Sequence, residues 1–200
     1  VQAMINNVNA AQDLLTAIGI DEEDGAATTT AATDAQLNNI VGVSGAIKAN
    51  ESAYQFYIDQ NAGNFGNPAT AAEVQTMIDE VNASENILAQ IGNEGDDPDT
   101  TPSIVTVNEL GSIVGITGVV PSNETQYQEY IDMHPALFND PATLTEVQDM
   151  IEAVNTSQSV LAQIGSQGDE PDVVPSVVTT TQLESITGIT NVDPTNEALY

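Results

Sequence analysis

Basic residues are almost absent from this chain of 200 residues. Its Lys and Arg total one residue, Lys48, against 30 Asp and Glu, and its formal net charge is -29. Proteins that bind nucleic acids or anionic membranes neutralise phosphate groups with Lys and Arg. The composition therefore excludes nucleic acid as a partner. Cysteine is absent as well, which excludes disulfides, thiolate catalysis and Cys-based zinc sites.

Aromatic residues and long hydrophobic runs are also scarce. Aromatics make up 4% of the chain and Trp is absent, so a core has to consist mainly of Val, Ile, Leu and Ala. No apolar run approaches the roughly 18 residues of a membrane span, and we expect no direct membrane insertion. A helical pattern starts at Val1 without an initiator Met, and we interpret the sequence as an excerpt of a longer chain.

The sequence does contain an internal repeat, which is the signature of a repeat architecture. Val1-Gln2 recurs as Val74-Gln75 and Val147-Gln148, with a spacing of 73 residues each time. The same spacing relates further sets of positions: Ile18, Ile91 and Ile164; Leu37, Leu110 and Leu183; Tyr54, Tyr127 and Tyr200. The chain therefore holds two full periods and most of a third.

The most regular pattern of each period predicts a long helix. Between residues 143 and 164, apolar residues recur every three or four positions, as on one face of an α-helix. Thr143 and Glu146 form a capping box at its start, and Gly165 follows the last apolar residue as a helix-ending glycine. The same signals occur one period earlier at Thr70, Glu73 and Gly92.

Two shorter helices are predicted in each period. The first begins with a capping box and a glycine ends it after about two and a half turns at most; its starts are Thr33, Thr106 and Thr179. The second begins near Asn50, Asn123 or Asn196, and we interpret Asn50 and Asn123 as N-caps. Tyr127, Tyr130 and Ile131 share one face of the middle copy, and we predict that the tyrosines, Tyr200 included, are core anchors. Phe56 replaces Glu129 of the next copy and is expected to be exposed.

Acidic stretches, two of which contain Pro, separate the long helix from the next short one. Pro and like charges favour extended segments. We therefore predict an all-α fold, a tandem array of small three-helix modules with a 73-residue period joined by acidic Pro-containing linkers. The expected boundaries are 1–19 for the last helix of a preceding module, 20–32 for an acidic linker, 33–92 for a module, 93–105 for a linker, 106–165 for a module, 166–178 for a linker and 179–200 for the first two helices of a following module.

Two arrangements of the modules are compatible with the sequence. Each module of about 60 residues can close on itself as a small, marginally stable bundle, like a bead on a string. Alternatively, helix faces continue against the next module and form a solenoid-like rod. The Pro-containing linkers favour the arrangement of separate beads, and the solenoid-like rod remains the alternative.

Nothing in the sequence indicates catalysis. The single His, His134, corresponds to Asn61 one period earlier, and Lys48 corresponds to Pro121 and Pro194, so neither side chain recurs. An enzyme would break the repeat symmetry with a cluster of reactive residues, and none is visible. We predict that the chain is not an enzyme.

The acidic linkers are the one candidate ligand site. Three carboxylates lie within four residues in each of the last two linkers: Asp96, Asp97 and Asp99, and then Asp169, Glu170 and Asp172. Calcium takes six to eight oxygen ligands, often from several carboxylates, although neither linker is an EF-hand loop. Calcium is the only cofactor that the residues suggest. A plain solvated linker is the alternative interpretation.

Sequons recur in register at Asn50 and Asn123, and at Asn82 and Asn155. Such sequons suggest glycosylation of an exported protein. The alternative is that the first pair caps helices, the second pair lies within helices, and an Asn-, Ser- and Thr-rich sequence forms sequons by chance. Both interpretations stay open.

Several phrases carry a resemblance to known proteins: NPATAAEVQ at 67–75, VNAS at 81–84, ILAQIG at 87–92 and NETQYQEYI at 123–131. They resemble the tandem helical repeats of very large secreted bacterial surface proteins, including adhesin-like and biofilm-matrix proteins. The resemblance is one of repeat style over the whole chain. It implies an extracellular, cell-surface stalk or fibre in which copy number sets length, and it implies no binding residues.

We therefore expect a structural repeat segment of an extracellular microbial surface protein, acting as a spacer, stalk or self-assembling fibre subunit. Its expected partners are neighbouring modules and other copies of itself. The alternative function is a repeated three-helix binding module that grips a host or matrix protein. The copies differ at surface positions such as Ser52, Thr125 and Ala198, which argues against one repeated epitope.

Overall fold

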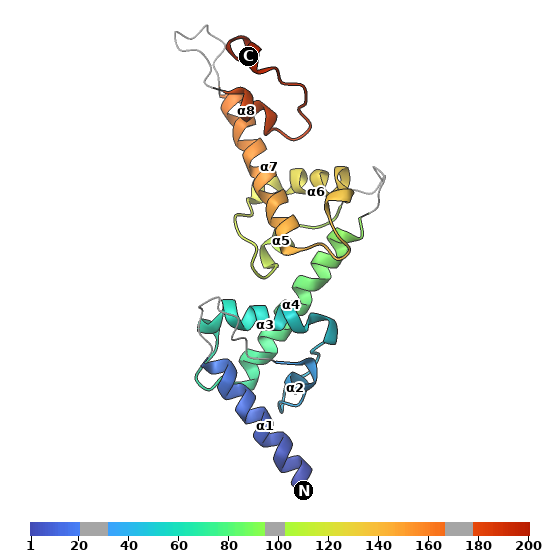
Figure 1. Ribbon diagram of the computed structural model, residues 1–200, viewed down its shortest axis with the longest axis vertical. Helices are drawn as coiled ribbons and strands as arrows, with labels where there is room; N and C mark the ends of the chain where they lie inside the picture. The colour runs from blue at the N-terminus through green and yellow to red at the C-terminus, as the bar shows by residue number, and fades with distance from the viewer. Residues whose placement is uncertain (21–31, 95–102, 167–177) are drawn as a thin grey trace. The chain divides into compact units, whose positions relative to one another are not determined.

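The computed structural model describes residues 1–20, 32–94, 103–166 and 178–200 (Figure 1). Within these ranges the chain forms helices, turns and loops and no β-strand, which confirms the all-α class. The α-helices are α1 (Gln2–Gly19), α2 (Asp34–Asn38), α3 (Glu51–Gln60), α4 (Ala71–Gly92), α5 (Val107–Ser112), α6 (Glu124–Met133), α7 (Leu144–Gly165) and α8 (Thr180–Glu184). Short 3-10 turns occur at Lys48–Asn50, Ala62–Asn64, Pro121–Asn123, Pro135–Leu137 and Pro194–Leu199.

The long helices begin and end where the sequence predicts. The Thr143 hydroxyl accepts a hydrogen bond from the backbone N–H of Glu146, the Glu146 carboxylate accepts one from the N–H of Thr143, and α7 ends at Gly165. The same reciprocal pair joins Thr70 and Glu73 before α4. Each box satisfies two N–H groups that the first helical turn leaves without an intrahelical partner.

The first short helix of each period also begins as predicted, with capping boxes at Thr33, Thr106 and Thr179. The second short helix follows a 3-10 turn at Asn50 and at Asn123, giving α3 and α6. In the third copy the turn Pro194–Leu199 replaces an α-helix near Asn196. Asn50 and Asn123 occupy the N-cap positions of α3 and α6, as interpreted, but neither side chain bonds the helix that it precedes.

The chain divides into two compact units. The first unit comprises Val1–Ile87 with Ser112–Val114, and the second comprises Leu88–Gly111 with Gly115–Tyr200. The core of the first unit combines the second half of α1 with α2, α3 and the first half of α4. Its members include Leu14, Ile18, Leu37, Tyr54, Ile58, Met77 and Ile78.

In the second unit, α6 packs against α7 (Figure 1). Its buried residues come from the end of α4, from α5 and α6, and from the first half of α7: Leu88, Ile91, Leu110, Tyr127, Ile131, Val147, Met150 and Ile151. A smaller cluster joins Val160 of α7 to Val178 and Ile186. Helix α4 therefore supplies buried residues to both units.

The tyrosines differ in how deeply they are buried. Tyr54, Tyr57 and Tyr127 are buried, as predicted for core anchors, whereas Tyr130 is half-buried. The prediction is wrong for Tyr200, which is 53% exposed: among the described residues, no long helix packs over it as α4 packs over Tyr54 and α7 over Tyr127. Phe56 is exposed, as expected.

Candidate functional site

The most specific polar contact of the fold joins the long helix to the segment before α3 or α6. In the first unit, Asn82 of α4 accepts hydrogen bonds from the Asn50 amide at 2.9 Å and from the Tyr54 hydroxyl, and its own amide donates to the Gly45 carbonyl at 2.9 Å. The Tyr54 hydroxyl also accepts from the N–H of Ile47 at 2.9 Å. One side chain on the long helix thus fixes three points of the facing segment.

The second unit contains the same contact 73 residues later. Asn155 of α7 accepts from the Asn123 amide at 2.9 Å and from the Tyr127 hydroxyl, and it donates to the Gly118 carbonyl at 2.8 Å. The Tyr127 hydroxyl accepts from the N–H of Val120 at 3.0 Å. We call this arrangement the Asn-Tyr contact.

A glutamine about two helical turns before the asparagine, on the same face of the long helix, binds the backbone of the same segment. Gln75 accepts from the N–H of Ser44 at 2.8 Å and donates to the Ser44 carbonyl at 3.1 Å. Gln148 and Thr117 form the same pair at 3.1 and 3.3 Å. The glycines that follow, at positions 45 and 118, have positive φ angles of 81° and 73°. That backbone conformation favours Gly, and the turn it forms presents the carbonyl that the asparagine binds.

All four sequon asparagines therefore lie in the Asn-Tyr contact. The Nδ2 atom, to which an N-glycan is attached, donates a hydrogen bond in each of them. Asn123 is buried. These positions have a packing role that is independent of glycosylation, and the signal that could have revealed it is the separation of 32 residues shared by Asn50 with Asn82 and by Asn123 with Asn155.

A second recurring contact lies at the C-terminal end of the long helix. The N–H of Ala69 donates to the Leu15 carbonyl of α1 at 3.0 Å, and the N–H of Ala142 donates to the Leu88 carbonyl of α4 at 3.0 Å. Gly92 comes so close to the Asn139 carbonyl and the Ala142 N–H that a Cβ atom there would overlap both. A loop that follows a cis Asn67-Pro68 or Asp140-Pro141 peptide bond thus caps the helix end in each unit.

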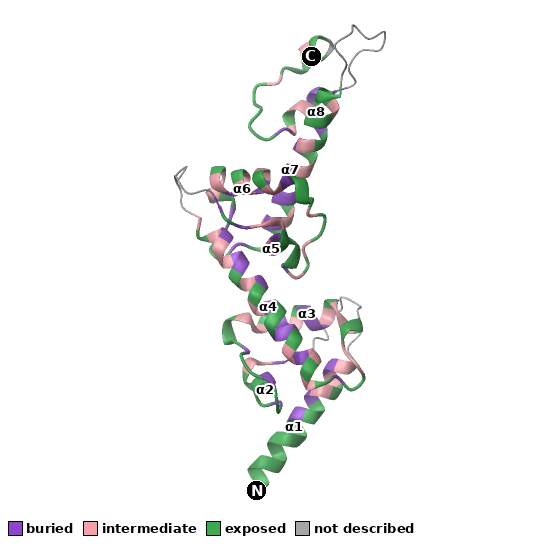
Figure 2. Ribbon diagram, turned by 180° about the vertical axis from the view of Figure 1, so that it is seen from behind, coloured by how far each residue is buried: buried purple, intermediate pink, exposed green. Residues whose placement is uncertain are grey.

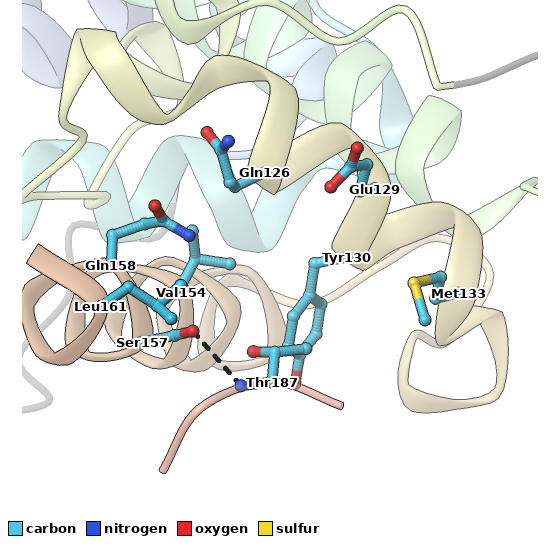
Figure 3. Close-up of a pocket in the computed structure, with 9 residues that line it drawn as sticks. All are labelled: Gln126, Glu129, Tyr130, Met133, Val154, Ser157, Gln158, Leu161 and Thr187. Carbon is cyan, nitrogen blue, oxygen red and sulfur yellow. Dashed lines mark hydrogen bonds between the residues drawn. The ribbon is translucent and has the colours of Figure 1, made fainter. Parts of the chain in front are cut away.

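Helix α7 has no such loop against its end among the described residues. Nothing lies within 4 Å of a Cβ built on Gly165, and Leu161, which corresponds to the buried Leu88, is exposed. A groove of about 350 Å³ opens between α6 and this part of α7 (Figure 3). In the figure, the Tyr130 ring points toward Thr187, whose N–H donates to the Ser157 hydroxyl at 3.2 Å.

The groove does not have the chemistry of an active site. Glu129 is the only ionisable carboxylate that lines it, and the other lining groups are amides, hydroxyls and apolar side chains. Five of the nine lining residues differ from their counterparts one period earlier; Glu129, for example, corresponds to Phe56 and Met133 to Gln60. The groove is therefore not a binding site repeated in each period.

His134 and Lys48, the two residues considered for a catalytic role, make contacts with residues close to them in the sequence. His134 ends α6, where its Nδ1 lies 2.9 Å from the Tyr130 carbonyl and its ring lies 4.4 Å from the Tyr130 ring. Lys48 forms an ion pair with Glu51 at 2.8 Å. The hydrogen bond from Lys48, followed by the one from the Asp34 N–H, lowers the pKa of Glu51 to about 2.

The predicted calcium ligands fall outside the described residues: Asp96, Asp97, Asp99, Asp169, Glu170 and Asp172. Elsewhere, in the ranges that the structure does describe, no three His, Cys, Asp or Glu side chains gather as a metal site would require. The described helices include none with the length and apolar character needed to cross a membrane.

Comparison with known proteins found no matching family model, no matching curated protein and no matching solved structure. Function must therefore be argued from the contacts of this chain alone.

Proposed function

We propose that this chain is a structural repeat segment of an extracellular microbial surface protein, acting as a spacer, stalk or self-assembling fibre subunit. In this proposal the chain is a tandem array of three-helix modules with a 73-residue period, joined by acidic Pro-containing linkers. The function of such a segment is to provide length, and the number of modules determines that length.

One observation carries the proposal: α4 supplies buried residues at both of its ends. Met77 and Ile78 belong to the core of the first unit, while Leu88 and Ile91 are buried in the second. A module that shares a helix with its successor gains stability from each neighbour, as in repeat proteins where neighbouring repeats bury a common core. Added copies then extend the array without a new kind of contact.

The composition supports the surface and extracellular part of the proposal. A charge of -29 keeps an array of many copies soluble through self-repulsion. The absence of Cys leaves no thiol to oxidise outside the cell.

The test is to change the number of periods and measure length. Residues 74–146 form one full period, so duplicating or deleting them adds or removes one module without altering any junction sequence. We expect the maximum dimension from small-angle X-ray scattering to change by the same increment in each direction. A fixed increment supports shared helices, wide scatter supports separate beads, and no increase on duplication overturns the spacer proposal.

The same measurement in calcium and in chelator tests the linkers. If Asp96, Asp97 and Asp99 and their counterparts bind calcium, the length distribution narrows when calcium is added, because coordination orders a linker. Identical profiles in both solutions would remove calcium from the proposal and leave a solvated linker.

A further inference from the structure

A cleft of about 310 Å³ opens between α3, the loop that follows it and the first half of α4. The Tyr57 and Phe65 rings pack edge to face there, with their centroids 6.1 Å apart. Helix α4 contributes residues at spacings of three and four, which share one helical face. Helix α3 and its loop therefore supply two aromatic rings and an amide, and α4 supplies two carboxylates and a hydroxyl. The lining residues are Tyr57, Asn64, Phe65, Glu73, Thr76 and Glu80.

The cleft lies in the interior of the sequence and is open to solvent. Thr76 and Glu80 are exposed, and Figure 2 shows exposed and buried bands alternating along α4. Asp149 of the second unit, the counterpart of Thr76, is exposed as well, and so is Leu137, the counterpart of Asn64. Exposure at these positions is therefore a property of the repeat in both units.

Most hydrogen-bond donors in the cleft are already engaged. The Tyr57 hydroxyl donates to Glu80 Oε2 at 2.6 Å, and the Thr76 hydroxyl donates to the Ala72 carbonyl at 3.0 Å. One N–H of the Asn64 amide donates to the Tyr57 oxygen at 3.2 Å. Burial, followed by the hydrogen bond to Glu80, raises the pKa of Tyr57, so its hydroxyl stays a donor at neutral pH. The cleft therefore has little with which to bind an anion.

The acceptors of the cleft are only half used. Glu73 Oε2 accepts from the N–H groups of Gly66 at 3.1 Å and Thr70 at 2.7 Å. Glu80 likewise uses its Oε2 atom, which accepts from Tyr57. Among the described residues, no donor is bonded to the Oε1 atom of either carboxylate. Because an ionised carboxylate accepts hydrogen bonds and donates none, the cleft favours a ligand that donates hydrogen bonds and carries positive charge.

The positive charge has to come from another molecule. Lys48 forms an ion pair with Glu51, and the chain has no other Lys or Arg. Glu80 follows Glu73 by seven residues, which is about 10.5 Å along the helix axis. A contact of about 2.8 Å at each carboxylate leaves about 5 Å between two nitrogen atoms, a distance that a chain of four carbons spans.

We propose that this cleft binds a small linear diamine in its diammonium form. One ammonium group donates to Glu73 Oε1 and the other to Glu80 Oε1. The methylene chain lies against the Phe65 ring, as the stems of long cationic side chains lie on apolar surfaces. The proposal goes beyond the spacer function and does not depend on it, because it concerns one cleft of one unit.

The second unit is an internal control, because it lacks half of the site. Ala153 occupies the position of Glu80, and Leu137 occupies that of Asn64. The ring of Tyr130, the counterpart of Tyr57, lies 4.4 Å from the His134 ring instead. A diamine attracted only by the overall negative charge of the chain would not distinguish the two units.

Titration of the nitrogen-15-labelled chain with putrescine, the four-carbon diamine, tests the proposal by NMR. About 0.15 M NaCl screens the diffuse attraction between the ligand and the acidic surface. We expect saturable, one-to-one shifts of the amide signals around Glu73 and Glu80, and no comparable shifts around Ala153. Butylamine has the same stem and a single ammonium group. It should bind about twofold to fivefold more weakly, as the loss of one exposed ion pair predicts.

Two substitutions distinguish the site from the general charge of the chain. Glu80→Gln keeps an acceptor for Tyr57 but removes a charge, so it should weaken putrescine binding about twofold to fivefold. Asp79→Asn is the matched control: it removes the same charge from the next residue, which does not line the cleft, and it should bind putrescine like the parent chain. Equal weakening by the two substitutions, shifts spread evenly over both units, or the absence of saturable shifts would overturn the proposal.

Discussion

Replacing Asn155 with Ala should destabilise the second unit far more than a surface substitution in a helix. The side chain accepts hydrogen bonds from Asn123 and Tyr127 and donates to Gly118. Asn123 is 9% exposed and Tyr127 is fully buried, so neither freed donor reaches water easily. Gly118 is exposed and can turn to solvent.

The magnitude follows from the two freed donors. Leaving a buried hydrogen-bonding group without a partner costs about 1 to 3 kcal/mol. Two such groups cost about 2 to 6 kcal/mol, and the higher helix propensity of Ala returns roughly 0.5 kcal/mol. We therefore expect a loss of about 2 to 5 kcal/mol from the second unit. Losses of this size have a small number of physical causes, one of which is the breaking of a buried hydrogen-bond network.

The chain supplies its own control, because Asn9 occupies the same position of α1 and is exposed. At a concentration low enough to keep the chain monomeric, Asn9→Ala should change stability by less than about 0.5 kcal/mol. Repeat units need not unfold together, so the assay is hydrogen exchange followed by mass spectrometry. Protection in α6 and α7 should fall roughly 30-fold or more in Asn155→Ala. Equal effects of the two substitutions would refute a structural role for the Asn-Tyr contact.

Two further predictions concern the helix ends and the caps. Gly92→Ala should lower the free energy of unfolding in urea by about 1 to 3 kcal/mol, because its methyl group would overlap the backbone at Asn139 and Ala142. Gly165→Ala is the control: its methyl group meets nothing within 4 Å, so the substitution should be neutral or stabilising. Equal losses from the two substitutions would contradict the close approach at Gly92. Hydrogen bonds from the N–H of Thr70, and then of Gly66, lower the pKa of Glu73 below its usual 4.5. A depressed pKa in the folded state adds stability above pH 4.5 that is lost as the pH falls through the folded pKa. The stability difference between the parent chain and Glu73→Gln should therefore shrink as the pH falls below 4.5 and through the folded pKa. A difference that does not change with pH would contradict this assignment.

Local sequence rules predict the helices of this chain well and its long-range contacts poorly. The capping boxes at Thr33, Thr143 and Thr179 are confirmed because both partners lie within one helical turn. Asn50 and Asn123 follow the same rules and yet bond asparagines 32 residues away. A good N-cap residue can bond either its own helix or another one, and local pattern alone does not separate the two.

Burial also depends on contacts that the local sequence pattern does not specify. Met4, Met77 and Met150 share one pattern and one helix position, but only the last two are covered. Tyr54, Tyr127 and Tyr200 divide in the same way. A helical period identifies the face that prefers burial, whereas actual burial depends on a segment tens of residues away. The candidate calcium ligands Asp96 to Asp99 and Asp169 to Asp172 lie outside the described residues, so that prediction stays a prediction.

The period itself carries the information that local rules miss. When Asn82 and Asn155 make the same three hydrogen bonds, the contact is a property of the repeat rather than of one helix. In the tandem array proposed above, each copy would contribute a similar interface term to stability, as repeats do in nearest-neighbour arrays. The repeat therefore specifies both sides of its own junction.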